Sequence, residues 1–173
     1  MSQTNAKRTH GFCSRSKYPV KDRSVAKGLR MHARQIDRIR DSFVLVLFDP
    51  DRAAKLFYDR LFELEPETRT LFSRDMEDQG RTLIRTLAIV VTGLSRLDAM
   101  IPTLSDLAIR HVRYGVERHH YAAVGVAIID MLDVVCADDF DADTRASWSE
   151  AYRLIADAMI AAAYPPTQDL VGL

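Results

Sequence analysis

Apolar residues recur at helical spacing along most of the chain. Between residues 32 and 163, large apolar side chains return every three or four positions, which is the spacing of one face of an α-helix. No segment alternates between apolar and polar residues with period two over a useful length. The pattern therefore predicts an all-α protein with six or seven helices and no β-strand.

Proline and capping residues divide this pattern into separate helices. Asp49 and Pro50 mark the end of one predicted helix and the start of the next, because Asp caps a helix N-terminus and Pro suits the first helical position. Asp141 is the predicted N-cap of the last helix. The predicted helices span residues 32–48, 50–64, a short turn that Pro66 opens, 76–94, a short segment that Pro102 opens and that contains His111, 117–137 and 142–163.

His111 is the first candidate for chemistry. Leu104, Leu107 and Ala108 precede it by one or two turns on the same predicted helix face, and Gly115 is expected to end that helix. A histidine at the end of an apolar helix, just before a glycine corner, suits a ligand held against a flat apolar cofactor. The helix alone also allows a hydrogen-bonded core histidine.

The charge of the chain is divided unevenly. The 173 residues have a formal net charge of zero, but the first 34 contain nine Lys or Arg against one Asp, which gives +8 there and −8 in the remainder. We expect residues 1–31 to be a basic, flexible extension and residues 32–173 to fold as one domain. The extension is expected to be solvated. Weaker alternatives are nucleic-acid binding and a translation start at Met31.

Several classes of function lack their sequence signals. Cys13 and Cys136 form no metal or redox motif, and thiols are compatible with a cytoplasmic protein. No uninterrupted apolar run reaches about 18 residues, so no membrane span is expected. There is no Gly-rich phosphate loop and no zinc spacing. His119 and His120 are adjacent, so we expect them to point to different faces and to make a poor metal pair.

Several motifs together resemble the single-domain bacterial globins and the haem domain of flavohaemoglobins. Residues 54–72 are similar to their second and third helices, with Tyr58 at the distal tyrosine and Phe72 at the phenylalanine after the proline. Gln79 lies 32 residues before His111, the family's spacing from distal glutamine to proximal histidine. The run RHVRYGVERHHYAAVG resembles the proximal motif. The resemblance covers about residues 33–163.

The resemblance implies a globin fold that holds haem b, with His111 as the iron ligand. The Leu107 carbonyl, one turn back, is the candidate acceptor for the other ring nitrogen of His111. Tyr58 and Gln79 would donate hydrogen bonds to the gaseous ligand, next to Leu83; otherwise Tyr58 is a core tyrosine and Gln79 a solvated helix residue. The residues expected to line the haem are Phe57, Phe72, Leu83, Leu107, His111, Tyr121, Val124 and Trp148.

The sequence departs from flavohaemoglobins in two ways. The position of their glutamate on the last helix, which partners the pocket tyrosine and the proximal histidine, is Ala163 here. A proximal charge relay is therefore in doubt. The chain also ends ten residues later, so no flavin or nicotinamide domain is expected.

The expected function is the binding of O2 and of other diatomic gases, NO and CO, by a cytoplasmic monomer or homodimer. Enzymatic NO detoxification would depend on an external reductase. A haem-based gas sensor or signalling module is the first alternative. A globin-fold interaction protein without haem is the second.

Overall fold

The computed structural model describes residues 30–72 and 75–165, and the basic extension up to residue 29 lies outside these ranges. The described residues form six α-helices and three short 3₁₀ helices with no β-strand, which confirms the all-α prediction. In chain order they are α2 (Ala33–Phe48), α3 (Pro50–Leu64), η1 (Pro66–Leu71), α4 (Met76–Gly93), η2 (Leu94–Arg96), α5 (Leu97–Arg113), α6 (His120–Cys136), η3 (Ala137–Asp139) and α7 (Ala142–Ala163).

Side-chain caps set the starts of α3 and α7. The Asp49 carboxylate accepts from the Arg52 amide at 3.1 Å, directly before Pro50 at the start of α3. The Asp141 carboxylate accepts from the Thr144 amide at 2.7 Å at the start of α7. Each cap satisfies an amide that has no partner within the helix. The predicted bounds of α3 and α7 are confirmed.

The helix that carries His111 is longer than predicted. It begins at Leu97, and Pro102 lies inside it instead of at its start. Proline in a helix removes one amide donor and is normally costly there. Leu97 and Leu104 are both almost fully buried, and α5 packs along α7. Burial of this face on both sides of the proline favours one continuous helix.

Three other helix ends, on α6 and α4, also differ from the prediction. α6 begins at His120, three residues after the predicted start, because residues 117–119 form a turn in which the His120 amide donates to the Glu117 carbonyl at 3.2 Å. At its other end Ala137 has a φ of 47°, in the left-handed region, which stops the helix one residue early. α4 ends at Gly93, and Leu94 already belongs to η2.

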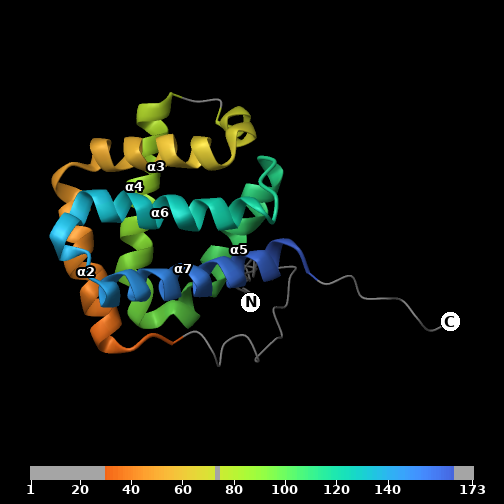
Figure 1. Cartoon of the computed structure of the whole chain (residues 1–173). Helices are drawn as coiled ribbons and strands as arrows, with labels where there is room; N and C mark the ends of the chain where they lie inside the picture. The colour runs from red at the N-terminus through yellow and green to blue at the C-terminus, as the bar shows by residue number, and fades with distance from the viewer. Residues whose placement is uncertain (1–29, 73–74, 166–173) are drawn as a thin grey trace, which may run out of the picture.

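The helices cross in two directions. Figure 1 shows α3, α6 and α7 nearly aligned, one beside the next, with α2 and α4 running across them. The contacts agree, since α3 packs on α6 and α6 on α7. The buried apolar residues form two groups: a larger core between α2, α3, α4, α6 and α7, and a smaller cluster between α5, α7 and Tyr121. Met31 packs against both groups, although it was assigned to the extension.

Two stretches are long and apolar enough to cross a membrane, judged by length and composition alone: residues 76–113 and 120–139. The expectation of no membrane span rested on a different test, the length of uninterrupted apolar runs. The core helices of soluble proteins pass the same test. The first stretch is two helices joined by η2, and α6, in the second, packs against α2, α3 and α7.

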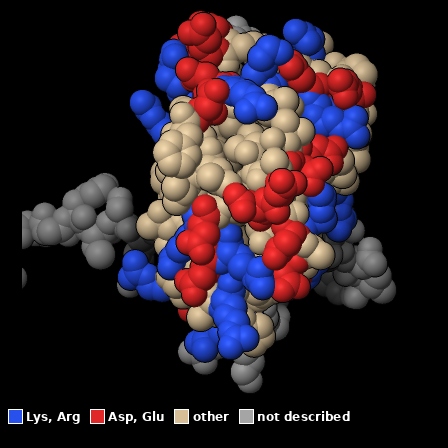
Figure 2. All heavy atoms as spheres, turned by 60° about the vertical axis from the view of Figure 1, so that its left-hand side comes forward, with Lys and Arg blue, Asp and Glu red and all other residues tan. Residues whose placement is uncertain are grey.

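One side of α2 stays uncovered. Val44 and Leu47 are each 51% exposed and Phe48 is 78% exposed. This side of the molecule comes forward in Figure 2, where uncharged side chains form an area bordered by charges of both signs. The helix therefore buries only the face that carries Ile36, Ile39, Phe43 and Val46.

We predict that Gly80→Val destabilises the fold. A Cβ at Gly80 would lie 2.9 Å from the Cβ of Ala54, so α4 crosses α3 too closely for a side chain at this position. Overpacking of this kind costs about 1–3 kcal/mol in the free energy of unfolding. Chemical denaturation measures it. Thr82→Val, an exposed site on the same helix, is the control and should change stability by less than about 0.5 kcal/mol. Equal effects would contradict the prediction.

Candidate functional site

His111 lies in the last turn of α5 and offers one ring nitrogen to its surroundings. Its Nδ1 is 2.9 Å from the Leu107 carbonyl oxygen, the acceptor expected from helix geometry. A carbonyl can only accept, so Nδ1 carries the proton and Nε2 keeps its lone pair. Burial lowers the pKa of His111. The imidazole is therefore neutral near pH 7, as a metal ligand must be.

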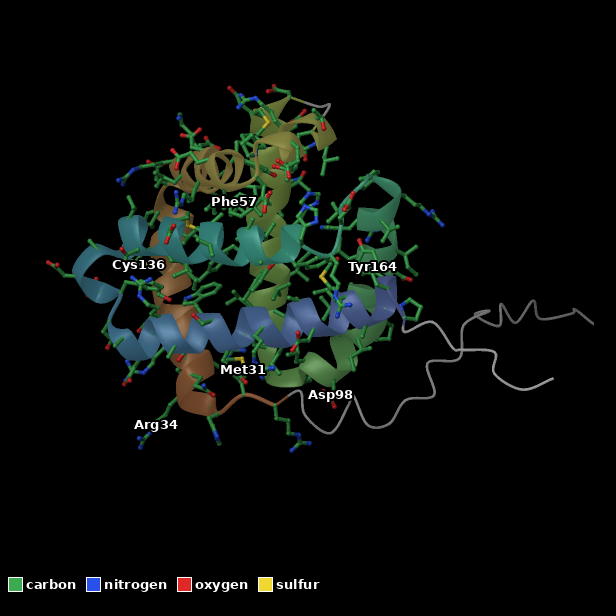
Figure 3. All side chains as sticks on the ribbon, turned by 45° about the vertical axis from the view of Figure 1, so that its right-hand side comes forward. Met31, Arg34, Phe57, Asp98, Cys136 and Tyr164 are labelled. Atoms are coloured by element: carbon green, nitrogen blue, oxygen red, sulfur yellow. The ribbon has the colours of Figure 1, made fainter. Side chains whose placement is uncertain are left out.

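The corner after His111 is held by backbone and side-chain hydrogen bonds. Gly115 has a φ of 88°, which favours glycine. The Val116 amide donates to the His111 carbonyl at 3.0 Å. The Val116 carbonyl accepts from the Tyr164 hydroxyl at 2.6 Å, so the end of α7 fixes the corner (Figure 3). Sequence reasoning missed Tyr164, because a tyrosine before Pro165 carries no signal of such a contact.

Tyr58, Phe72 and Gln79 meet at one place, as the resemblance implied. The Tyr58 hydroxyl donates to the backbone carbonyl of Gln79 at 3.4 Å. The Tyr58 ring packs against Phe72 at 5.2 Å and Phe62 at 5.8 Å between centroids. Burial raises the pKa of Tyr58 to about 12, so its hydroxyl stays protonated and can donate. Phe62 was not predicted, since one more apolar residue on α3 carries no distinguishing signal.

η1, which leads to Phe72, contacts the residues that follow His111. A Cβ on Gly115 would lie 3.1 Å from the Cδ2 of Leu71, so η1 packs on the corner that follows His111. The Glu67 carboxylate, also on η1, lies 3.9 Å from the Nε2 of His119. The fold thus brings the Tyr58 group and His111 to one side of the molecule.

Apolar side chains from three helices remain half-buried against the two groups of buried residues. They are Leu83 on α4, Leu107 on α5 and Val124 on α6. α4 and α5 make little direct contact with each other. An apolar disc such as haem needs apolar surface from several helices and one neutral imidazole. The residues present fit that group.

Tyr121 is buried with its hydroxyl unpaired. The side chain is 7% exposed, and the hydroxyl has no hydrogen-bond partner among the described residues. Burial raises the pKa of Tyr121 to about 12, with a smaller electrostatic contribution from Tyr164. Ala163 borders the same cluster and offers no side-chain acceptor. The described residues therefore place no carboxylate behind Tyr121, in line with the doubt about a proximal relay.

Trp148 and Phe57 lie in the larger core. The Trp148 indole donates to the Ser42 hydroxyl at 2.9 Å, and its ring centroid is 6.2 Å from that of Phe43. These contacts join α2 to α7, so we reassign Trp148 from the haem site to the core. Phe57 is 3% exposed, lies between α3 and α6 in Figure 3, and supports Tyr58 by an edge contact at 5.0 Å.

His119 and His120 do not point apart. Their ring centroids are 4.1 Å from each other. The expectation took adjacent helical residues to point apart. His119 is the N-cap of α6 and has helical backbone angles (φ −69°, ψ −28°), so the two rings converge through their side-chain conformations.

A cleft of about 650 Å³ lies between α6 and α7. Among the predicted site residues only Tyr121 lines it. His111, Tyr58 and Gln79 are not in its wall. We therefore do not assign the predicted cofactor to this cleft.

Comparison with known proteins gives a consistent result. A family model described as Globin matches residues 55–159. The flavohemoprotein of Halalkalibacterium halodurans is 30% identical over 109 residues, which are 61% of this chain and 26% of the relative. The flavohemoprotein of Bacillus subtilis is 28% identical over 107 residues, which are 60% of this chain and 27% of the relative. That of Bacillus cereus is 27% identical over 134 residues, which are 75% of this chain and 33% of the relative. The chain thus spans about a quarter to a third of the length of these relatives.

We predict that Tyr164→Phe loosens the corner after His111. The substitution removes only the hydroxyl that donates to Val116, and a hydrogen bond of this kind contributes about 0.5–1.5 kcal/mol to the free energy of unfolding. Denaturant titration measures the loss. Tyr114→Phe is the matched control, because Tyr114 is 64% exposed, and it should leave stability unchanged. If the two variants are indistinguishable, the Tyr164 contact does not hold the corner.

Proposed function

The chain belongs to the globin family, whose members are haem proteins that bind diatomic ligands, and from this premise we propose that it holds haem b through His111 and binds O2, NO or CO beside Tyr58 and Gln79. One observation supports the proposal above the others. The Nδ1 of His111 is committed to the Leu107 carbonyl, which leaves a neutral Nε2 free to bind iron.

Haem b, when bound, supplies an iron centre that takes a diatomic gas as a ligand and can change its oxidation state. The residues of the chain would bind the iron and surround the porphyrin. His111 would hold the iron, while Phe72, Leu83, Leu107 and Val124 would exclude water from the porphyrin. The hydrogen bond at Nδ1 fixes the orientation of the imidazole ring and raises its basicity.

Tyr58 is suited to stabilise a polar ligand. Its hydroxyl is protonated and buried, and its present bond to the Gln79 carbonyl is long, at 3.4 Å. A bond of that length is weak, so the hydroxyl can turn to a better acceptor. The half-buried Gln79 follows on α4 and can bring its side-chain amide to the same place.

We place reversible gas binding first and NO detoxification second. A more basic histidine ligand would favour cleavage of an O–O bond at the iron. Among the described residues, the Tyr121 hydroxyl has no carboxylate partner that would make His111 more basic. Detoxification would then require an external reductase to return electrons. A gas-sensing role would use the same site.

The proposal is tested by the visible spectrum of the purified chain with haem. We expect a Soret band that shifts on reduction and again with O2 and CO, and we expect His111→Ala to lose tight haem binding. His119→Ala is the control. It lies outside the last turn of α5 and is half-exposed, so its spectrum should be unchanged. A normal spectrum in His111→Ala would overturn the assignment.

We predict that Tyr58→Phe speeds O2 dissociation about tenfold, which corresponds to about 1.4 kcal/mol, while CO dissociation barely changes. The reason is that bound O2 is more polar than bound CO and loses more with the hydroxyl. Gln79→Leu should have the same effect to a smaller degree. Stopped-flow replacement of each gas measures the rates.

Phe62→Leu is the steric control for this prediction. Phe62 stacks on Tyr58 and has no polar group, so its substitution should shift the two dissociation rates by similar factors. Equal effects of Tyr58→Phe on O2 and CO would point to a steric role for Tyr58 and would contradict a hydrogen bond.

A further inference from the structure

Three metal-ligating side chains converge outside the proposed haem site. Glu67 comes from η1, and His119 and His120 come from the start of α6. One ligand atom from each residue lies within 4.8 Å of the other two. The Nε2 of His119 is 3.9 Å from a Glu67 oxygen, and the two imidazole centroids are 4.1 Å apart. In Figure 1, η1 and the connection before α6 lie close together at one end of the molecule.

The three residues combine one fixed group with two movable ones. His120 is 6% exposed, and its Nδ1 accepts from the Glu117 amide at 2.9 Å. The side chains of His119 and Glu67 are 52% and 59% exposed. A hydrogen bond from its own backbone amide lowers the pKa of the Glu67 carboxyl below its usual value.

We propose that Glu67, His119 and His120 form a binding site for a divalent transition cation of the Zn²⁺ type. Two imidazoles and one carboxylate are a known zinc ligand set that leaves further positions for water. Zinc holds its ligands at roughly 2.0–2.2 Å, so the donor atoms must move closer than they are now. Glu67 and His119 have the freedom to do so, while His120 anchors the site.

Binding has an identifiable cost. If the Nε2 of His120 ligates the metal, the ring proton moves to Nδ1, and the bond from the Glu117 amide is lost. Glu117 is exposed, so water can take the place of that bond. The start of α6 also disfavours a cation through the helix dipole. Both effects favour a metal that binds nitrogen strongly over Mg²⁺ or Ca²⁺, which prefer oxygen.

A cation at this site would join two segments that flank the proposed haem position. η1 leads directly to Phe72, and the turn that contains His119 follows the corner after His111. Between these segments, Leu71 lies against Gly115, and the Glu67 carboxylate approaches the Nε2 of His119 at 3.9 Å. The cation would tie them with direct metal bonds. This site does not depend on haem binding.

Calorimetric titration of the full chain with Zn²⁺, after removal of trace metal with a chelator, tests the proposal. We expect one saturable site that Mg²⁺ does not fill. Loss of a group that only hydrogen-bonds to a metal ligand typically weakens a metal site by about 10–100-fold, so loss of a direct ligand should cost at least about tenfold. Glu67→Gln and His119→Gln should each show that loss. Both side chains are exposed, so these variants should fold.

Matched controls come from the same protein. Glu63→Gln on α3 and His32→Gln before α2 replace an exposed acid and an exposed histidine elsewhere, and both should bind Zn²⁺ as the unmodified chain does. Circular dichroism confirms that each variant keeps its helices. Absence of saturable Zn²⁺ binding would overturn the proposal. Binding that survives in the Glu67→Gln/His119→Gln double variant would do the same, because the metal would then sit elsewhere.

Discussion

The hydrogen bond between the Nδ1 of His111 and the Leu107 carbonyl is the constraint on which the proposed chemistry depends. It lies within one turn of α5, so it forms wherever that helix forms. It commits one ring nitrogen and leaves the other with a lone pair. Burial keeps the ring neutral by lowering its pKa. The rest of the fold has to bring this imidazole and the Tyr58 group to the same side of the molecule.

The fold meets that requirement by packing its helices into two groups of buried residues. α4 and α5 belong mainly to different groups and have little direct contact. They approach through their connections: Leu71 packs on Gly115, and Tyr164 holds Val116. Leu83 and Val124 are half-buried against the larger group, and Leu107 is half-buried against the smaller one. Such apolar surface is what a flat apolar cofactor would cover.

Local signals in the sequence predicted most of the helices. The Asp49–Pro50 and Asp141 caps fixed two helix starts, because capping depends only on residues within one turn. The prediction was wrong at Pro102, where burial of Leu97 and Leu104 outweighs the local preference of proline. It was also wrong for His119 and His120, whose rings converge although the backbone at His119 is already helical.

The sequence by itself determined the all-α class, the position of His111 before a glycine corner, and the spacing to Gln79 and Tyr58 by which the chain resembles a globin. Spacing, caps and periodicity are properties of neighbouring residues. Only the tertiary structure decided that Trp148 belongs to the core, that Tyr164 closes the corner, that the Tyr121 hydroxyl is unpaired among the described residues, and that Glu67 faces two histidines. These contacts join residues far apart in the chain, and the angles at which the helices pack set them.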